Sequence, residues 1–174
     1  EYQSMDEMRA DAKSLGCDAV VNCTGLGAAK VCNDDQLVGA RGILLNFDRK
    51  ATVRRAAVRE GLYGPNKHDA VIMSEEEPWG SDTAPAYLIP RGDSIVVGGS
   101  YLEGDTEMSI RPEERERLLR NANMLGIDID QSTSISDWTG FRPFRSSVRC
   151  EIDSDVSDNV RVVHSYGYGG SGWT

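Results

Sequence analysis

An arginine set in a stiff, apolar stretch of backbone is the residue of this chain best suited to chemistry. Arg142 lies between Phe141 and Pro143 in the sequence WTGFRPFR. Proline restricts the backbone, and a guanidinium held there presents the planar fork that binds a carboxylate through two parallel hydrogen bonds. We therefore predict that Arg142 binds the carboxylate of a small ligand.

A glycine-rich segment near the end of the chain predicts a larger ligand beside that carboxylate. Residues 164–174 read HSYGYGGSGWT and follow an apolar run. Glycines let backbone amides come close to a flat or phosphorylated group. Residues 167–172 match G-x-G-x-x-G, but a dinucleotide fingerprint also needs a following helix and an acidic residue about twenty positions on. We therefore interpret the segment as a loop that abuts a cofactor from another direction, not as a Rossmann first turn.

The composition argues against several classes of partner. The net charge of −9 is opposite in sign to the basic footprint that nucleic-acid binding needs, and the apolar runs are too short to cross a bilayer. The four cysteines form no C-x-x-C pair, and only two histidines accompany them, so we expect no metal site. We accordingly predict no nucleic-acid partner and no membrane span.

The expected elements alternate between helix and strand. A helix, a short buried strand and a glycine turn open the chain, in the order typical of a nucleotide-binding α/β sheet. The segment 54–63 reads as either helix or loop. Tyr87 and Tyr101 are separated by an expected hairpin, so their side chains could converge on one face, although each is equally well explained as a half-buried sheet tyrosine. We expect helices over residues 4–15 and 111–125, and strands over 18–22, 43–47, 70–73, 87–90, 94–97, 148–152 and 160–163.

Six short segments together resemble the D-amino-acid oxidases. Their order and spacing carry the resemblance, which covers nearly the whole chain. The segments are VNCTG at 21–25, RG at 41–42, AYLIP at 86–90, GGSY at 98–101, TGFRP at 139–143 and VHSYG at 163–167 with the glycines after it.

The resemblance implies an α/β fold in two domains. Residues 1–37 would form part of a Rossmann-like FAD-binding domain, residues 38–144 a substrate-binding domain built on a mixed or antiparallel β-sheet, and residues 145–174 a truncated return to the FAD-binding domain. The family's N-terminal Rossmann unit and its C-terminal helix have no counterpart here, so we expect residues 1–174 alone to be inactive and to hold FAD poorly.

The resemblance also implies roles for individual residues. Arg142 would pair with the substrate carboxylate, Tyr87 would donate a hydrogen bond to it, and Tyr101 would line the pocket for the substrate side chain. The cofactor is expected to be FAD. The residues expected to bind it are Cys23, Thr24, Gly25, Gly169, Gly170, Ser171, Gly172, Trp173 and Thr174.

The activity implied is the oxidative deamination of neutral D-amino acids by FAD and oxygen, which yields 2-oxo acids, ammonia and hydrogen peroxide. Two related activities are alternatives, that of a D-aspartate oxidase and that of an oxidase of the glycine or sarcosine type. A third, of another class, is a non-catalytic α/β module that binds carboxylates. The partners expected are the D-amino acid and oxygen, a homodimer is left open, and the location would be the peroxisome in a eukaryote and otherwise the cytoplasm.

Overall fold

The chain forms two compact units. Unit 1 comprises Glu1–Ala40, Glu103–Asp105 and Phe141–Thr174, and unit 2 comprises Arg41–Leu102 and Thr106–Gly140. Unit 1 includes Arg142, which our expected boundaries assigned to the middle segment. The assignment of the units to FAD and to substrate stays a prediction. The computed structural model describes residues 2–48, 52–54, 71–72, 86–124, 127–154 and 159–170.

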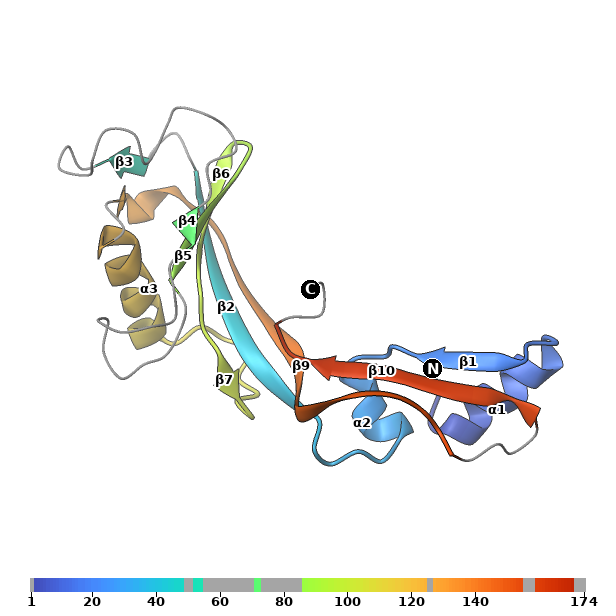
Figure 1. Cartoon of the computed structure of the whole chain (residues 1–174). Coiled ribbons are helices and arrows are strands. Elements are labelled where there is room, and N and C mark those ends of the chain that lie inside the picture. The colour runs from blue at the N-terminus through green and yellow to red at the C-terminus, as the bar shows by residue number, and fades with distance from the viewer. Residues whose placement is uncertain are drawn as a thin grey trace. The chain divides into compact units, whose positions relative to one another are not determined.

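Unit 1 is a small α/β arrangement. Strand β1 (Ala19–Asn22) pairs in parallel with β10 (Arg161–Tyr168), and β10 pairs antiparallel with the later part of β9 (Ser134–Ile152). Helix α1 (Met5–Ser14) packs on β1, and the short helix α2 (Gly27–Val31) follows β1 in the chain (Figure 1). A mixed sheet with helices confirms the predicted α/β class.

Helix α1 begins where its sequence predicts. The hydroxyl of Ser4 accepts a backbone N–H from the first turn, which satisfies one of the amides that a helix leaves free at its start. Met8 and Ala12 lie on one face and are buried. Leu15, which the expected range 4–15 included in the helix, lies outside it, because the helix ends at Ser14, and Leu15 is 72% exposed.

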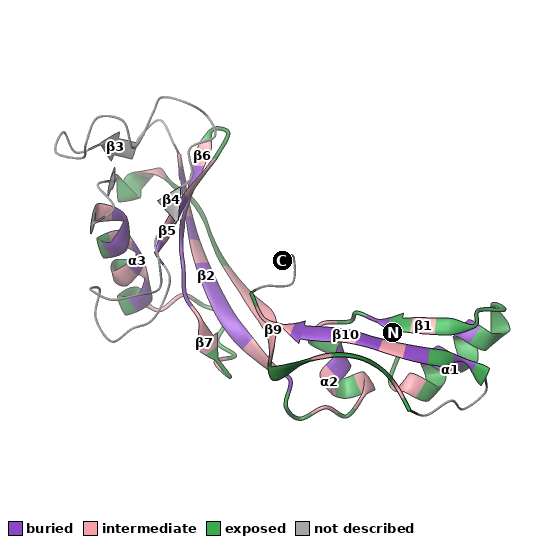
Figure 2. Cartoon of the chain, in the orientation of Figure 1, coloured by how far each residue is buried: buried purple, intermediate pink, exposed green. Residues whose placement is uncertain are grey.

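Unit 2 is an antiparallel sheet with a helix on one face. Strands β2 (Val38–Asp48), β6 (Ser94–Gly98), β5 (Tyr87–Arg91) and β4 (Val71–Ile72) are neighbours in that order. Helix α3 (Pro112–Met124) lies against β5 and β6, with its buried side turned to the sheet (Figure 2). The buried core consists of Ile43, Leu45, Phe47, Ala86, Leu88, Ile95, Val97, Leu118 and Ala122.

The remaining elements are short. The bounds are β3 (Thr52–Arg54), which pairs with β8 (Ile127–Ile129), β7 (Leu102–Glu103), which pairs with β2, and a 3₁₀ turn at Gln131–Thr133. The segment 54–63, apart from Arg54, lies outside the described residues, as do two residues of the strand expected at 70–73. None of the helices in the described ranges is long and apolar enough to cross a membrane.

A fully buried arginine ties β2 to α3 in unit 2. Both guanidinium nitrogens Nη1 and Nη2 of Arg41 donate to the Glu114 carboxylate, at 2.6 and 3.1 Å. Nε donates to the carbonyl of Glu107 and Nη2 to that of Ser109, each at 2.5 Å. Burial alone would raise the pKa of Glu114, but hydrogen bonds from Arg41 and from a backbone amide lower it overall. The pair therefore holds the segment before α3 in place.

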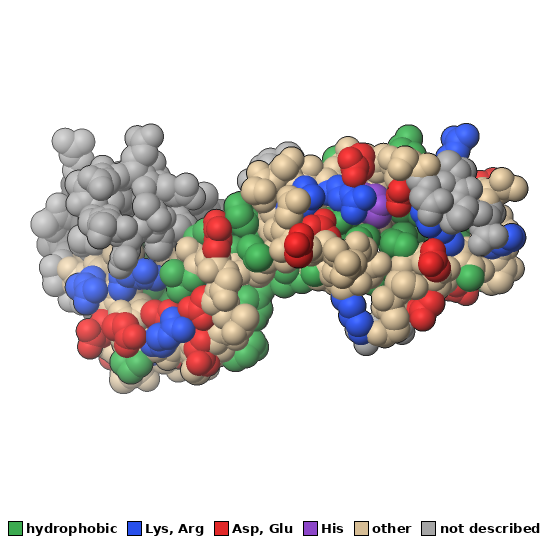
Figure 3. Space-filling model, turned by 90° about the horizontal axis from the view of Figure 1, so that it is seen from below, with side chains coloured by type: hydrophobic (Ala, Val, Ile, Leu, Met, Phe, Trp, Pro, Cys, Tyr) green, Lys and Arg blue, Asp and Glu red, His purple; other side chains and the backbone are tan. Residues whose placement is uncertain are grey.

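Charged side chains of both signs are interleaved over the described part of the surface seen in Figure 3. Ion pairs within unit 2 include Arg115 with Asp137 at 2.6 Å and the more exposed pair of Arg120 with Glu116 at 3.8 Å. Exposed pairs of this kind contribute little to stability.

Candidate functional site

Two turns that carry expected cofactor residues follow the carboxyl ends of parallel strands. In β1 and β10, Asn22 lies opposite His164 and both strands run in the same direction. The turn at 23–25 follows β1, and the turn at 169–170 follows β10. In open α/β sheets, ligands bind outside the carboxyl ends of the strands, so both turns lie where a ligand of unit 1 would bind.

The turn after β1 is anchored by a buried asparagine. Oδ1 of Asn22 accepts hydrogen bonds from the backbone N–H of Thr24 at 3.2 Å and from its Oγ1 at 2.7 Å. Gly25 then adopts a φ of +58°, which glycine reaches without strain. Cys23 and Thr24 are exposed and Gly25 is partly buried. The buried Asn22 therefore fixes the turn, while Cys23 and Thr24 remain accessible to solvent.

The turn after β10 is tied to β9. Gly169 has a φ of +59°, and its N–H donates to the carbonyl of Pro143 at 2.7 Å. A Cβ added at Gly170 would lie 3.7 Å from Cδ of Arg142. The other four residues expected to bind the cofactor lie outside the described residues, namely Ser171, Gly172, Trp173 and Thr174.

Pro143 lies between the two turns. A Cβ added at Gly25 would be 3.8 Å from its Cγ, and its carbonyl holds the amide of Gly169. The structure therefore brings together three segments that the sequence analysis singled out separately, residues 24–25, 142–143 and 169–170. Gly25 and Gly169 carry no side chain of their own, a property that fits close backbone contact with a large, flat cofactor such as FAD.

Arg142 is partly buried in β9. The ring of its neighbour Phe141 packs against Gly39 of β2, where an added Cβ would lie 3.4 Å from Cδ1. The strand is thus fixed on one side of Arg142 by this aromatic contact and on the other by the Pro143 hydrogen bond. The role of Arg142 in binding a carboxylate remains a prediction.

The two expected pocket tyrosines lie in unit 2. Tyr87 begins β5 opposite Gly98 of β6, and its ring covers Gly98 and Gly99 so closely that a Cβ added at Gly98 would overlap it. Tyr101 is partly buried and follows Ser100, whose buried Oγ accepts the N–H of Ile43 at 2.9 Å. The ring of Tyr87 is therefore held against Gly98 and Gly99, and the contact of both tyrosines with a substrate remains a prediction.

Sequence reasoning missed a partly buried polar network behind the glycine turn. Oδ2 of Asp34 accepts hydrogen bonds from Oη of Tyr166 at 2.8 Å and from Nε of Arg145 at 3.1 Å, and Nη1 of Arg149 donates to Oη of Tyr166 at 2.9 Å. Burial would raise the pKa of Asp34, but these donors and a backbone amide lower it overall. Burial and the bond to Asp34 raise the pKa of Tyr166 to about 12. Nothing in the local sequence signals this network, because Asp34 and Arg145 are 111 residues apart.

A second group of buried polar side chains supports Asn22. Its Nδ2 lies 3.3 Å from Nδ1 of His164 and 3.0 Å from Sγ of Cys32, and Nε2 of His164 lies 3.3 Å from Oδ2 of Asp153. Because an amide NH₂ can only donate, Nδ1 of His164 accepts and Nε2 carries the hydrogen towards Asp153. This group locks the amide whose oxygen holds Thr24. Within the described ranges, no three His, Cys, Asp or Glu side chains are grouped as metal ligands.

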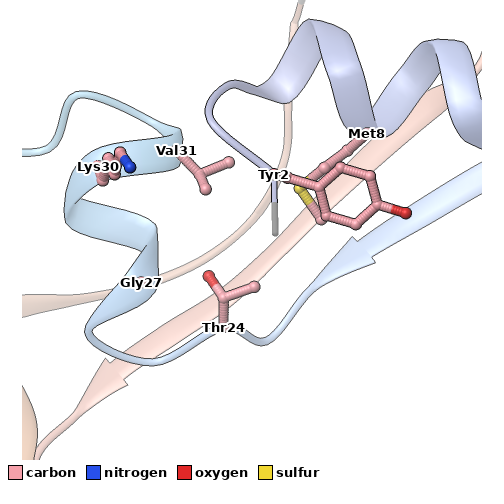
Figure 4. Close-up of a pocket in the computed structure, with 6 residues that line it drawn as sticks. All are labelled: Tyr2, Met8, Thr24, Gly27, Lys30 and Val31. Atoms are coloured by element: carbon pink, nitrogen blue, oxygen red, sulfur yellow. The ribbon is translucent and has the colours of Figure 1, made fainter.

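A pocket of about 260 Å³ adjoins the turn after β1. Figure 4 shows Thr24 on that turn, with Lys30 and Val31 on α2 and with Tyr2 and Met8 at the start of the chain. Sites for drug-sized ligands occupy roughly 300–1,000 Å³, so this pocket by itself has room for only part of a dinucleotide. Its lining residues are Tyr2, Met8, Thr24, Gly27, Lys30 and Val31.

Comparison with known families decides how the chain is classified. A family described as FAD dependent oxidoreductase matches residues 5–174. The chain belongs to this family. FAD is accordingly its cofactor, as the resemblance implied. The glycine turns at 24–25 and 169–170 thus occur in a chain of an FAD-dependent oxidoreductase.

Curated relatives of this oxidoreductase chain include D-amino-acid and D-aspartate oxidases. It is 30% identical over 159 residues to the D-amino-acid oxidase of Rubrobacter xylanophilus, covering 91% of this chain and 42% of that protein. It is 31% identical over 164 residues to the D-amino-acid oxidase of Dictyostelium discoideum, covering 90% of this chain and 39% of that protein. It is 27% identical over 183 residues to D-aspartate oxidase 2 of Caenorhabditis elegans, covering 100% and 45%. The chain thus spans less than half the length of these relatives.

Solved structures share the fold at low identity. Glycine oxidase from Bacillus cereus matches with a TM-score of 0.51 and 14% identity, over 87% of this chain and 38% of that one. The glycerol-3-phosphate dehydrogenase from Bacillus halodurans complexed with FAD matches with a TM-score of 0.52 and 20% identity, over 84% and 28%. At such identities the likeness establishes the fold of this oxidoreductase chain and not its substrate.

Proposed function

We propose that the full-length protein is an oxidase that uses FAD and oxygen to convert neutral D-amino acids and water to 2-oxo acids, ammonia and hydrogen peroxide. The observation that carries this proposal is the meeting of Arg142 and Pro143 with the glycine turns at 24–25 and 169–170, in a chain of the FAD-dependent oxidoreductase family. That arrangement puts a guanidinium fork beside backbone suited to a flat cofactor. D-amino-acid oxidases among the relatives support the choice of substrate.

In this proposal the chain supplies binding and orientation. Arg142 forms two parallel N–H···O bonds with the substrate carboxylate, and the hydroxyl of Tyr87 donates a third. Capture at these points decides which substituent of Cα faces the cofactor, and such orientation can supply much of the rate enhancement. The substrate reacts with its amine neutral, so no side chain of the chain has to act as a general base.

FAD supplies the two-electron oxidation itself. The residues that hold it in this proposal are the turn at Cys23, Thr24 and Gly25 and the glycine turn that begins at Gly169. Their contribution is close backbone approach, since Gly25 and Gly169 have no side chain and adopt positive φ angles that glycine reaches without strain.

The proposed activity is tested by purifying the full-length protein and recording its absorption spectrum and peroxide release. We expect a yellow protein with flavin absorption bands, and peroxide release with D-alanine exceeding that with L-alanine, glycine or D-aspartate. D-aspartate as the best substrate would support the aspartate-oxidase alternative, and glycine the glycine-oxidase alternative. A colourless protein that binds small carboxylates without oxidising them would support the non-catalytic alternative.

Tyr101 is the basis for preferring neutral substrates. The relatives that act on D-aspartate must accommodate a second carboxylate, for which the family resemblance implies an arginine at this position. A tyrosine offers a hydroxyl and an apolar ring instead of a charge, so an acidic side chain would be buried there without a cation, which is costly.

Replacing Tyr101 by arginine is therefore expected to shift preference towards D-aspartate. We expect the ratio of kcat/KM for D-aspartate to that for D-alanine to rise roughly 10- to 150-fold, which corresponds to one hydrogen bond to a charged group of about 1.5–3 kcal/mol. Tyr101→Phe is the control, since it keeps the ring and adds no charge. An unchanged ratio in Tyr101→Arg would show that Tyr101 does not line the side-chain pocket.

A further inference from the structure

Strand β9 contains a large bulge immediately after the residues proposed to bind substrate. Arg149 pairs with Tyr166 of β10, but the next pair is Phe144 with Tyr168. Over this interval β10 advances two residues, from 166 to 168, whereas β9 spans five, from 149 to 144. The extra residues of β9 therefore leave the ladder, and bulges of this kind bend a strand and re-aim its side chains, often beside active sites.

Arg145 is the side chain that closes this bulge. Its Nη1 donates to the carbonyl of Ser147 at 2.6 Å, within the bulge itself. On the facing strand, Gly167 has a φ of +86°, and a Cβ added there would lie 2.7 Å from Cβ of Arg145. Only glycine lets β10 pass this close, so the conformation of both strands depends on where Arg145 lies.

Asp34 in turn fixes the position of Arg145. Nε of Arg145 donates to both oxygens of Asp34, at 3.1 and 3.4 Å, and the hydroxyl of Tyr166 donates to Oδ2 at 2.8 Å. The side chains of Asp34 and Arg145 are 7% and 16% exposed. With the backbone N–H of Gln36, which donates to Oδ1 at 3.1 Å, the carboxylate has three donors. It therefore has little freedom, and it links the loop after α2 to both β9 and β10.

Arg142 and Pro143 lie in β9 just before the bulge, which begins after Phe144. Pro143 accepts the amide of Gly169, and Gly170 lies against Arg142. We propose that Asp34 is a positioning residue, which acts through Arg145 and the bulge to hold Arg142 and the Gly169 turn in their binding geometry. The inference rests on the proposed function for the identity of what Arg142 binds.

The experiment compares Asp34→Ala and Asp34→Asn with the wild type in the full-length protein. Dissociation constants are measured for FAD by fluorescence titration of the apoprotein and for benzoate, a small carboxylate probe, by calorimetry. We expect Asp34→Ala to raise the dissociation constant for benzoate and the KM for D-alanine by roughly 10- to 100-fold. The reason is that misplacement of binding groups by about 1 Å can have an effect of this size. Asp34→Asn retains an acceptor for Tyr166 but loses the charge facing Arg145, so its effect should be intermediate.

Glu151→Gln is the matched control. Glu151 accepts from Arg149 at 2.7 Å at the exposed, outer end of the same network, and its replacement should change both constants less than about twofold. Asp34→Glu should restore part of the binding, because it returns the charge at a displaced position. The melting temperature is recorded for every variant, so that a change in stability is separated from a change in binding.

The outcomes separate this inference from the proposed function. If the Asp34 variants lose thermal stability but keep the wild-type constants for FAD and benzoate, Asp34 is only structural and the inference is overturned. If the wild type oxidises no D-amino acid, the proposed function fails, while the two binding constants still decide the role of Asp34. A wild type that binds neither FAD nor benzoate would overturn both.

Discussion

Replacing Arg142 by leucine in the full-length protein is expected to lower kcat/KM for D-alanine by about 30- to 4,000-fold. Truncating one partner of a buried, hydrogen-bonded charge pair costs roughly 2–5 kcal/mol, and each 1.4 kcal/mol corresponds to about a factor of ten. Leucine removes both hydrogen bonds to the carboxylate, and with them the alignment of Cα. The measurement is steady-state peroxide release over a range of D-alanine concentrations.

Two further variants make this result interpretable. Arg142→Lys should recover only part of the activity, because an ammonium group keeps the charge but lacks the planar fork. Arg161→Leu is the matched control, since Arg161 is an exposed arginine in strand β10 of the same unit. Activity of Arg142→Leu close to that of Arg161→Leu would contradict the assigned role of Arg142.

Replacing Arg41 by methionine is expected to lower the free energy of unfolding of the protein by about 3–5 kcal/mol, the usual cost of removing one partner of a buried ion pair. The side chain of Arg41 is 0% exposed and that of Glu114 is 8% exposed. Methionine fills a similar volume but leaves the Glu114 carboxylate without its bidentate partner and two backbone carbonyls without their donor. Equilibrium unfolding in urea measures the difference.

The double variant Arg41→Met with Glu114→Leu tests the reason for that loss. It should be more stable than Arg41→Met alone, because in the single variant the buried carboxylate loses its buried bidentate partner and keeps only the more exposed Arg111, at 2.9 Å. Arg120→Met is the control in the same helix, where the pair with Glu116 is exposed and contributes less than about 0.5 kcal/mol. Equal losses in Arg41→Met and Arg120→Met would show that burial of the pair does not matter.

The pH dependence of this effect has a definite sign. The pKa of Glu114 is lowered in the folded protein, because the Arg41 hydrogen bonds outweigh the opposing effect of burial. A carboxyl whose pKa is lowered by folding stabilises the protein above its ordinary pKa, and this contribution disappears as the pH falls through the lowered value. The difference in stability between the wild type and Arg41→Met should therefore shrink on acidification below about pH 4.3.

Elements with strong local signals were predictable. Helix α1 has Ser4 as its cap, and α3 has Pro112 as its first residue with two glutamates behind it. The hairpin of β5 and β6 surrounds a glycine with positive φ, Gly92. In each case neighbouring residues satisfy or restrict the backbone, so the sequence nearby carries the information.

Elements that depend on distant partners were predicted too short or were not predicted. Only residues 148–152 of β9 were expected to form a strand, whereas it spans Ser134–Ile152. Gly140 and Pro143 interrupt the pattern of side chains, and the bulge at 145–148 breaks the alternation on which strand prediction relies. Helix α2 was not expected at all, because it has only five residues and no side-chain cap.

By itself the sequence determined which residues could bind a carboxylate and a flat cofactor, since a guanidinium beside proline and a run of glycines have those properties wherever they lie. Only the tertiary structure decided that Gly25, Pro143 and Gly169 meet, that Arg41 is buried against Glu114, and that Asp34 holds Arg145. The physical reason is that a buried charge or a close backbone contact is defined by its partner. These partners are separated by tens to more than a hundred residues, so no local pattern identifies them.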